Sequence, residues 1–99
     1  MRVHEVARAL ASETRLTILE LLREPSKRLA SQREGDLGEA GACVSLIAAT
    51  VGISQPTATR HLDILRAAGL ITTERIGQRT FHRRNEAGIA EAQVILGQV

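Results

Sequence analysis

The stretch SQPTATRH holds the densest group of side chains in this 99-residue sequence that could recognise another molecule. Its polar members donate and accept hydrogen bonds, as side chains that bind base edges and phosphates of duplex DNA must do. They are Ser54, Gln55, Thr57, Thr59, Arg60 and His61. The stretch contains no carboxylate, which a phosphate would repel. These residue types favour contact with DNA, and a solvated helix start is the plainer alternative.

A helix must hold this stretch, because apolar residues follow it at helical spacing. Ala58, Leu62 and Leu65 form a stripe that would face the interior. Ser54 is a good N-cap, and Pro56 fits the first turn, where a missing N–H costs nothing. The polar start of the helix is therefore predicted to be exposed, while the stripe behind it docks on the domain.

Two flanking elements complete a recognisable order. An apolar face predicts a helix over Cys43–Val51, with Gly52 as its C-cap. After Gly69, the segment LITTERIGQRTFHRR predicts a β-hairpin that turns at Gly77-Gln78. Helix, turn, helix and hairpin in this order predict a winged helix-turn-helix, whose second helix enters the DNA major groove with its N-terminal end.

The rest of the chain predicts the frame of this motif. Residues 3–11 and 12–24 have apolar positions at helical spacing, and residues 87–99 predict a final helix that is apolar nearly all round. Such a helix needs a partner surface, so we expect the N- and C-terminal helices to dimerise. Residues 25–42 hold three glycines and mixed charges, and we expect a mobile inserted loop. The expected fold is a single α+β domain over residues 1–99, mainly α with a small β-hairpin, containing about five helices and a two-stranded wing.

Basic charge is concentrated in the predicted motif, although the formal net charge of the whole chain is only +2. Residues 54–85 contain six arginines against two carboxylates, whereas acidic residues are in excess elsewhere. This distribution favours a polyanionic partner, and a solvated basic face without a partner is the alternative.

Three blocks of the sequence resemble the ArsR/SmtB family of bacterial winged-helix repressors. The blocks are LASETRLTILELL, SQPTATRHLDILRAAGLI and ERIGQRTF, and the match leaves out residues 25–42. The resemblance implies a five-helix winged fold, a homodimer, and an operator of imperfect inverted-repeat double-stranded DNA. It also implies release of the operator when an effector binds, and nothing in the sequence identifies that effector.

The resemblance also implies roles for single residues of the helix that begins after Ser54, which we call the reading helix. It implies that Ser54 caps the helix and contacts a phosphate, and that Gln55, Thr57 and Thr59 belong to the exposed tip. Gln55 could pair bidentately with adenine, and Arg60 could meet a guanine edge or a phosphate. For His61 two roles stay open, a packed structural histidine and a phosphate contact.

On the wing, the resemblance implies that Arg75, Gln78 and Arg79 lie near the minor groove or the DNA backbone. Arg66 and Arg84 are expected to be solvated side chains without such a role.

The sensory sites that are frequent in this family are incomplete here. One begins the third helix with CVC, where this chain has CVS at Cys43, and the other needs Asp and His on the last helix, which has neither. We therefore predict no metal and no cofactor. A site built from Cys43 and His4, across the dimer, is a weak candidate. Cys43 as a small buried residue is the favoured interpretation, while a Cys43-dependent metal or redox-sensing repressor is an alternative.

Several other function classes are disfavoured. The sequence has no catalytic constellation, so we expect no enzyme. A single aromatic residue argues against binding of RNA or single strands, which are usually held by stacking. The sequence shows no signal-peptide pattern and no span for a membrane, and a cytoplasmic location is expected. The serious alternative is a winged-helix module that binds protein and no DNA.

Overall fold

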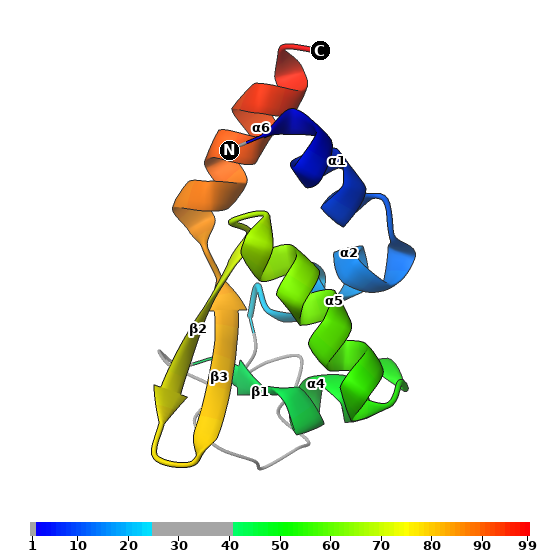
Figure 1. The fold of residues 1–99 in the computed structure, drawn as a ribbon, viewed down its shortest axis with the longest axis vertical. Coiled ribbons are helices and arrows are strands. Elements are labelled where there is room, and N and C mark those ends of the chain that lie inside the picture. Colours follow the sequence, from blue (N-terminus) through cyan, green and yellow to red (C-terminus); the bar gives the residue numbers. More distant parts are fainter. Residues whose placement is uncertain (1, 25–40) are drawn as a thin grey trace.

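The structure is a computed structural model that describes residues 2–24 and 41–99. In these ranges it has five helices and three strands (Figure 1). In chain order they are α1 (Val3–Leu10), α2 (Glu13–Leu21), β1 (Ala42–Cys43), α4 (Val44–Val51), α5 (Gln55–Ala67), β2 (Ile71–Ile76), β3 (Arg79–Arg84) and α6 (Glu86–Gly97). The start of α5 and the β2–β3 turn lie at one end of the molecule, and α1 and α6 lie at the other (Figure 1). The expected mainly α winged helix-turn-helix is confirmed.

The sheet has one strand more than the sequence predicts, within the part of the chain that is described. Its order is β1-β3-β2, all antiparallel, with Ala42 opposite His82 and Cys43 opposite Phe81. The prediction that the inserted loop reaches residue 42 and that the next helix starts at Cys43 is therefore wrong at this boundary. A strand of two residues is too short for an alternating pattern to reveal it. Residues 25–40 of the predicted loop lie outside the described residues.

Gly41 shows why the chain can join the sheet at this point. Its φ of +96° lies in the left-handed region, and a Cβ there would collide with the backbone carbonyl of His82. Only glycine allows both the conformation and this close approach.

The predicted end of α4 and the predicted start of α5 agree with the structure. Gly52 ends α4 in the left-handed conformation, with φ +84°. The Ser54 side chain accepts a hydrogen bond from the backbone N–H of Thr57 at 3.3 Å, and Pro56 lies in the first turn of α5. Behind this start, Ala58, Leu62 and Leu65 are buried, as their spacing predicts.

The helices α2, α4 and α5 share one apolar core with the sheet. Its largest fully buried side chains include Ile18, Leu46, Ile47 and Leu62. Full burial of a side chain of this size contributes about 1.5–3 kcal/mol, so the core fixes α5 firmly on the domain.

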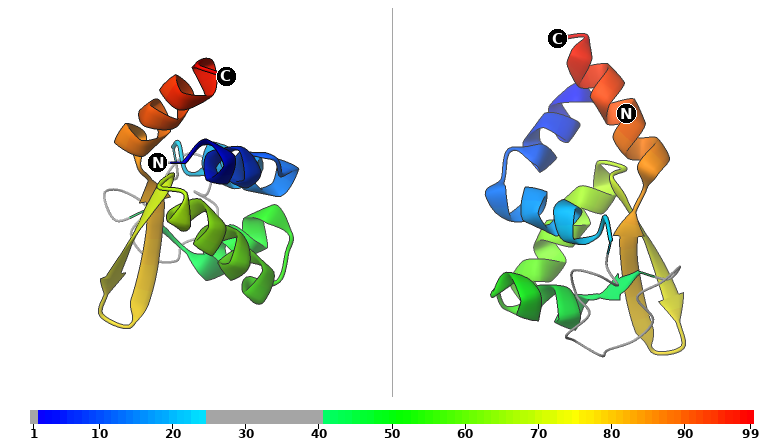
Figure 2. Two further views of the ribbon diagram at one scale, coloured as in Figure 1. Left: turned by 45° about the horizontal axis from the view of Figure 1, so that its top comes forward. Right: turned by 180° about the vertical axis from the view of Figure 1, so that it is seen from behind.

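The last helix leaves much of its apolar surface uncovered in the single chain. Of its residues only Gly88 and Ala92 are buried, and the side chain of Val94 is 62% exposed. The helix leans on α1, as the view from behind shows (Figure 2). No helix among the described residues is both long and apolar enough to span a membrane.

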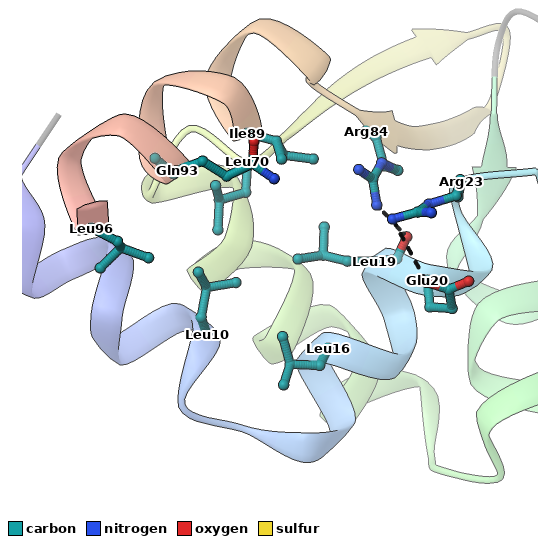
Figure 3. Close-up of a pocket in the computed structure, with 11 residues that line it drawn as sticks. Leu10, Leu16, Leu19, Glu20, Arg23, Leu70, Arg84, Ile89, Gln93 and Leu96 are labelled. Atoms are coloured by element: carbon teal, nitrogen blue, oxygen red, sulfur yellow. Dashed lines mark hydrogen bonds and ion pairs between the residues drawn. The ribbon is translucent and has the colours of Figure 1, made fainter.

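A hollow lies between α1, α2 and α6 (Figure 3). Its apolar walls come from three helices and from Leu70, which directly precedes β2. They include Leu10, Leu16, Leu19, Leu70, Ile89 and Leu96.

Arg84 borders this hollow, and the prediction that it is solvated is wrong. Its side chain is only 11% exposed and donates to the Leu19 carbonyl and to both carboxylate oxygens of Glu86. The hydrogen bond from Arg84 is the main reason why the pKa of Glu86 is lowered. This arginine therefore ties β3 to α2 and to the start of α6.

Candidate DNA interface

The start of α5 presents polar side chains, and two of them form the N-terminal cap of the helix. The Ser54 hydroxyl accepts from the Thr57 backbone N–H and donates to the Thr57 side-chain oxygen at 2.9 Å. Gln55, Thr59 and Arg60 are exposed, and no hydrogen bond within the described residues engages their side chains. These three side chains are therefore available to an outside partner, while Ser54 and Thr57 fix the geometry of the first turn.

The wing brings a second polar group to the same end of the molecule. The hairpin turns at Gly77, whose φ is +63°, and the register pairs Ile76 with Arg79 across the turn. Arg75, Gln78 and Arg79 are all exposed.

One hollow connects the reading helix and the wing. It is lined by Gln55 from α5 together with Gln78 and Arg79 from the turn and β3. The structure thus places residues predicted at the start of α5 and residues predicted on the wing on one surface. An α-helix end beside a basic hairpin is the arrangement that a winged helix-turn-helix offers to duplex DNA.

His61 is the member of the predicted set that the structure turns inward. It is half-buried, and its Nδ1 lies 3.1 Å from a guanidinium nitrogen of Arg15 on α2. Arginine only donates, so Nδ1 must accept and the imidazole is neutral with its proton on Nε2. Burial, then the charges of Arg15 and Arg60, lower the pKa of His61. Of the two open roles, the contact supports the packed structural one.

Sequence reasoning missed the partner of this histidine. Arg15 precedes His61 by 46 residues, and no local pattern links the two. The guanidinium also donates to the carbonyls of Arg8 and Ala9 at the end of α1. A function for Arg15 emerges only when the three helices are seen together.

Cys43 and His4 lie in different surroundings. Cys43 is buried before α4, with its Sγ 3.3 Å from the hydroxyl of Ser45, whereas His4 is exposed on α1. Among the described residues of one chain, no group of three or more His, Cys, Asp or Glu side chains is arranged to hold a metal ion. A Cys43–His4 site across a dimer stays a prediction.

Comparisons with known proteins agree with this geometry. Residues 10–74 match the model of a family described as a helix-turn-helix domain. The chain is 42% identical over 87 residues to the uncharacterised HTH-type transcriptional regulator YbzH of Bacillus subtilis, covering 88% of this chain and 87% of that protein. It is 37% identical over 79 residues to the HTH-type transcriptional repressor SmtB of Mycobacterium tuberculosis, covering 80% of this chain and 47% of SmtB. The chain belongs to the ArsR/SmtB family. As a member of this family it is a transcriptional regulator and not an enzyme.

Two solved structures of similar proteins have the same fold. One is the homodimeric winged helix-turn-helix DNA-binding domain of a possible ArsR-family regulator from Mycobacterium bovis, with a TM-score of 0.67 and 28% identity over 95% of this chain and 74% of that one. A possible transcriptional regulator for arsenical resistance has a TM-score of 0.72 at 22% identity, with coverage of 95% and 82%, and this likeness concerns the fold alone.

Proposed function

We propose that this ArsR/SmtB protein is a homodimeric, sequence-specific repressor that binds inverted-repeat operator DNA and is released by an effector. One observation carries the proposal: Gln55 of the reading helix lines a common hollow with Gln78 and Arg79 of the wing. Base edges in the major groove and the adjacent backbone can be contacted together from such a surface.

The proposed roles within this surface follow from the chemistry and the exposure of each side chain. Gln55 pairs with an adenine edge and Arg60 with a guanine edge or phosphate, because both are exposed at the N-terminal part of α5. Thr59 adds a hydroxyl on the same exposed part. Arg75 and Arg79 neutralise backbone phosphates from the wing.

The dimer is supported by apolar surface at the opposite end. Leu16, Val94 and Val99 are 49%, 62% and 93% exposed in the single chain, and an apolar hollow lies between α1, α2 and α6 (Figure 3). A second copy would cover this surface, and the M. bovis domain of the same family is homodimeric. Two reading helices related by a twofold axis match an inverted repeat.

A second candidate adds sensing by Cys43 to the same regulator. The Cys43 side chain lines the hollow that also contains Gln55 and Arg79, so a metal or an oxidised thiol there would disturb the DNA surface. The cytoplasm, where thiols stay reduced and DNA is accessible, is the proposed location for either candidate.

The test of the main proposal is capture of genomic DNA by the purified protein, followed by sequencing. The proposal expects a small set of enriched fragments that share an inverted repeat. Uniform recovery of the genome, or no recovery, would instead support a winged-helix module that binds protein.

Cys43→Ala separates the two candidates. If Cys43 is structural, the variant keeps the affinity of the wild type for a captured fragment, and neither protein is released by Zn²⁺ or hydrogen peroxide in an anisotropy titration. Release of the wild type alone would establish Cys43 as the sensor. Ser45→Ala is the matched control, because it removes the hydroxyl beside Sγ and keeps the thiol.

A further inference from the structure

A single guanidinium joins three helices on the side of the molecule where α1 ends. Arg15 donates from Nε to the Ala9 carbonyl at 2.7 Å and from Nη2 to the Arg8 carbonyl at 3.0 Å. Its Nη1 lies 3.1 Å from Nδ1 of His61. The two carbonyls belong to the last turn of α1, where the helix itself offers few partners, so Arg15 acts as a C-terminal cap supplied by α2.

The third contact reaches the reading helix directly behind its exposed surface. His61 follows Arg60 in α5, and its half-buried ring is close enough to Arg15 and Arg60 that both charges lower its pKa. Because the His61 ring accepts from Arg15, the position of α5 relative to the end of α1 is fixed by a directional bond in addition to the apolar core.

Only arginine can make this set of contacts at once. Its planar fork sends donors from three separate nitrogens toward three acceptors, whereas a lysine ammonium is one point at the end of a flexible chain. None of the three contacts of Arg15 involves a carboxylate. Arg15 therefore holds two backbone carbonyls and one imidazole in place, and these contacts do not neutralise its own positive charge.

We propose that Arg15 is a positioning residue for DNA reading, which holds α5 against the end of α1 through His61. The inference rests on the proposed function, because α5 must be the helix that contacts DNA. The inference adds that α1, which is expected in the dimer region, is connected to the reading helix α5. We call the contacts of Arg15 with Arg8, Ala9 and His61 the Arg15 joint. A shift of α1 therefore moves His61 and the neighbouring Arg60.

The first test does not involve DNA. The pKa of His61 is measured by NMR from the Cε1 proton in the wild type, in Arg15→Gln and in Arg8→Gln. The joint predicts a higher pKa of His61 in Arg15→Gln and an unchanged value in Arg8→Gln, which removes an exposed charge from the same region. Equal pKa values of His61 in all three proteins would overturn the proposal.

The second test is a double-mutant cycle on the affinity for a captured DNA fragment. Arg15→Gln and His61→Leu should each raise Kd about tenfold, the usual scale of a lost hydrogen bond to a charged group. The double variant should lose no more than either single variant, since both remove the same joint. Losses that multiply in the double variant would contradict the proposal, because His61 would then act independently of Arg15.

Conservative variants keep the test decisive if Arg15→Gln fails to fold. His61→Asn places an amide oxygen where Nδ1 accepts, and it should restore the affinity of the wild type, while His61→Leu should not. Equal Kd values for Asn and Leu would overturn the joint. Failure of the wild type to bind any captured fragment would contradict the proposed function instead, and the NMR result for Arg15 would still stand on its own.

Discussion

Single residues of α5 divide between those proposed to contact DNA and those that support the helix. Gln55, Thr59 and Arg60 are exposed with side chains that are free within the described residues, whereas Ser54 and Thr57 bond to each other. The same short stretch therefore contains both the surface and the cap that shapes it. The polar start of α5 therefore contains two groups of residues. Ser54 and Thr57 form the cap through their hydrogen bonds, whereas the other polar side chains form the exposed surface.

Arg60→Ala tests the reading role at this scale. If Arg60 binds a base edge, the variant should lose about 1–3 kcal/mol of binding free energy for the captured fragment. Arg66→Ala is the matched control on the same helix, because Arg66 is exposed and paired with Asp63 at 3.0 Å. Anisotropy titrations of both variants measure the difference. Equal Kd values for Arg60→Ala and the wild type would remove Arg60 from the interface.

We expect His82 to make the stability of the fold depend on pH. It is buried on β3, with Nδ1 3.1 Å from the Thr73 hydroxyl. Burial first, then the charge of Arg66, lowers its pKa, and the smaller opposing effect comes from Asp63. The folded state thus prefers the neutral ring. Above the usual histidine pKa of about 6.5 this preference is fully present, and it is lost as the pH falls through the lower folded value.

The free energy of unfolding of the wild type should therefore decrease as the pH falls below about 6.5, because the unfolded chain takes up the proton first. Urea titrations at several pH values measure the slope. In His82→Gln the slope should be smaller, and the remainder comes from His61, whose pKa is lowered too. Identical slopes in the two proteins would show that His82 does not titrate as its burial implies.

The elements of the motif differ in how far sequence reveals them. Helix α5 is predictable because capping, proline and apolar spacing agree on one answer. Strand β1 is not, because two residues carry no period and their pairing with β3 depends on a close approach at Gly41. Arg84 illustrates the same limit, since its burial depends on the Leu19 carbonyl, 65 residues away in the chain.

The outer face of α6 yields a prediction at the scale of elements. Val94→Glu should convert the dimer to a monomer, because a charge placed in a buried apolar interface is strongly unfavourable. Thr72→Glu adds the same charge at an exposed position of β2, outside the proposed dimer surface, and should leave the dimer intact. Sedimentation velocity distinguishes the two states. A dimeric Val94→Glu variant would place the interface elsewhere.

The whole molecule is elongated, with principal extents of 41 × 24 × 23 Å. The proposed DNA surface and the proposed dimer surface lie at opposite ends of it (Figure 1). This separation is what a twofold dimer needs to place two reading helices in successive major grooves, about 34 Å apart. The resemblance of three sequence blocks to the family predicted both the family and the fold. The contacts of Arg15 with α1 and α5 could be recognised only in the folded structure.

The most direct measurement is an anisotropy titration of the dimer with a duplex that carries the captured inverted repeat, compared with a shuffled duplex over a range of salt concentrations. The proposed function predicts at least about 1000-fold tighter binding to the inverted repeat. It also predicts that log affinity falls with log salt by about one unit for each phosphate contacted. Equal affinity for both duplexes, or binding that does not depend on salt, would contradict the claim that α5 and the wing read operator DNA.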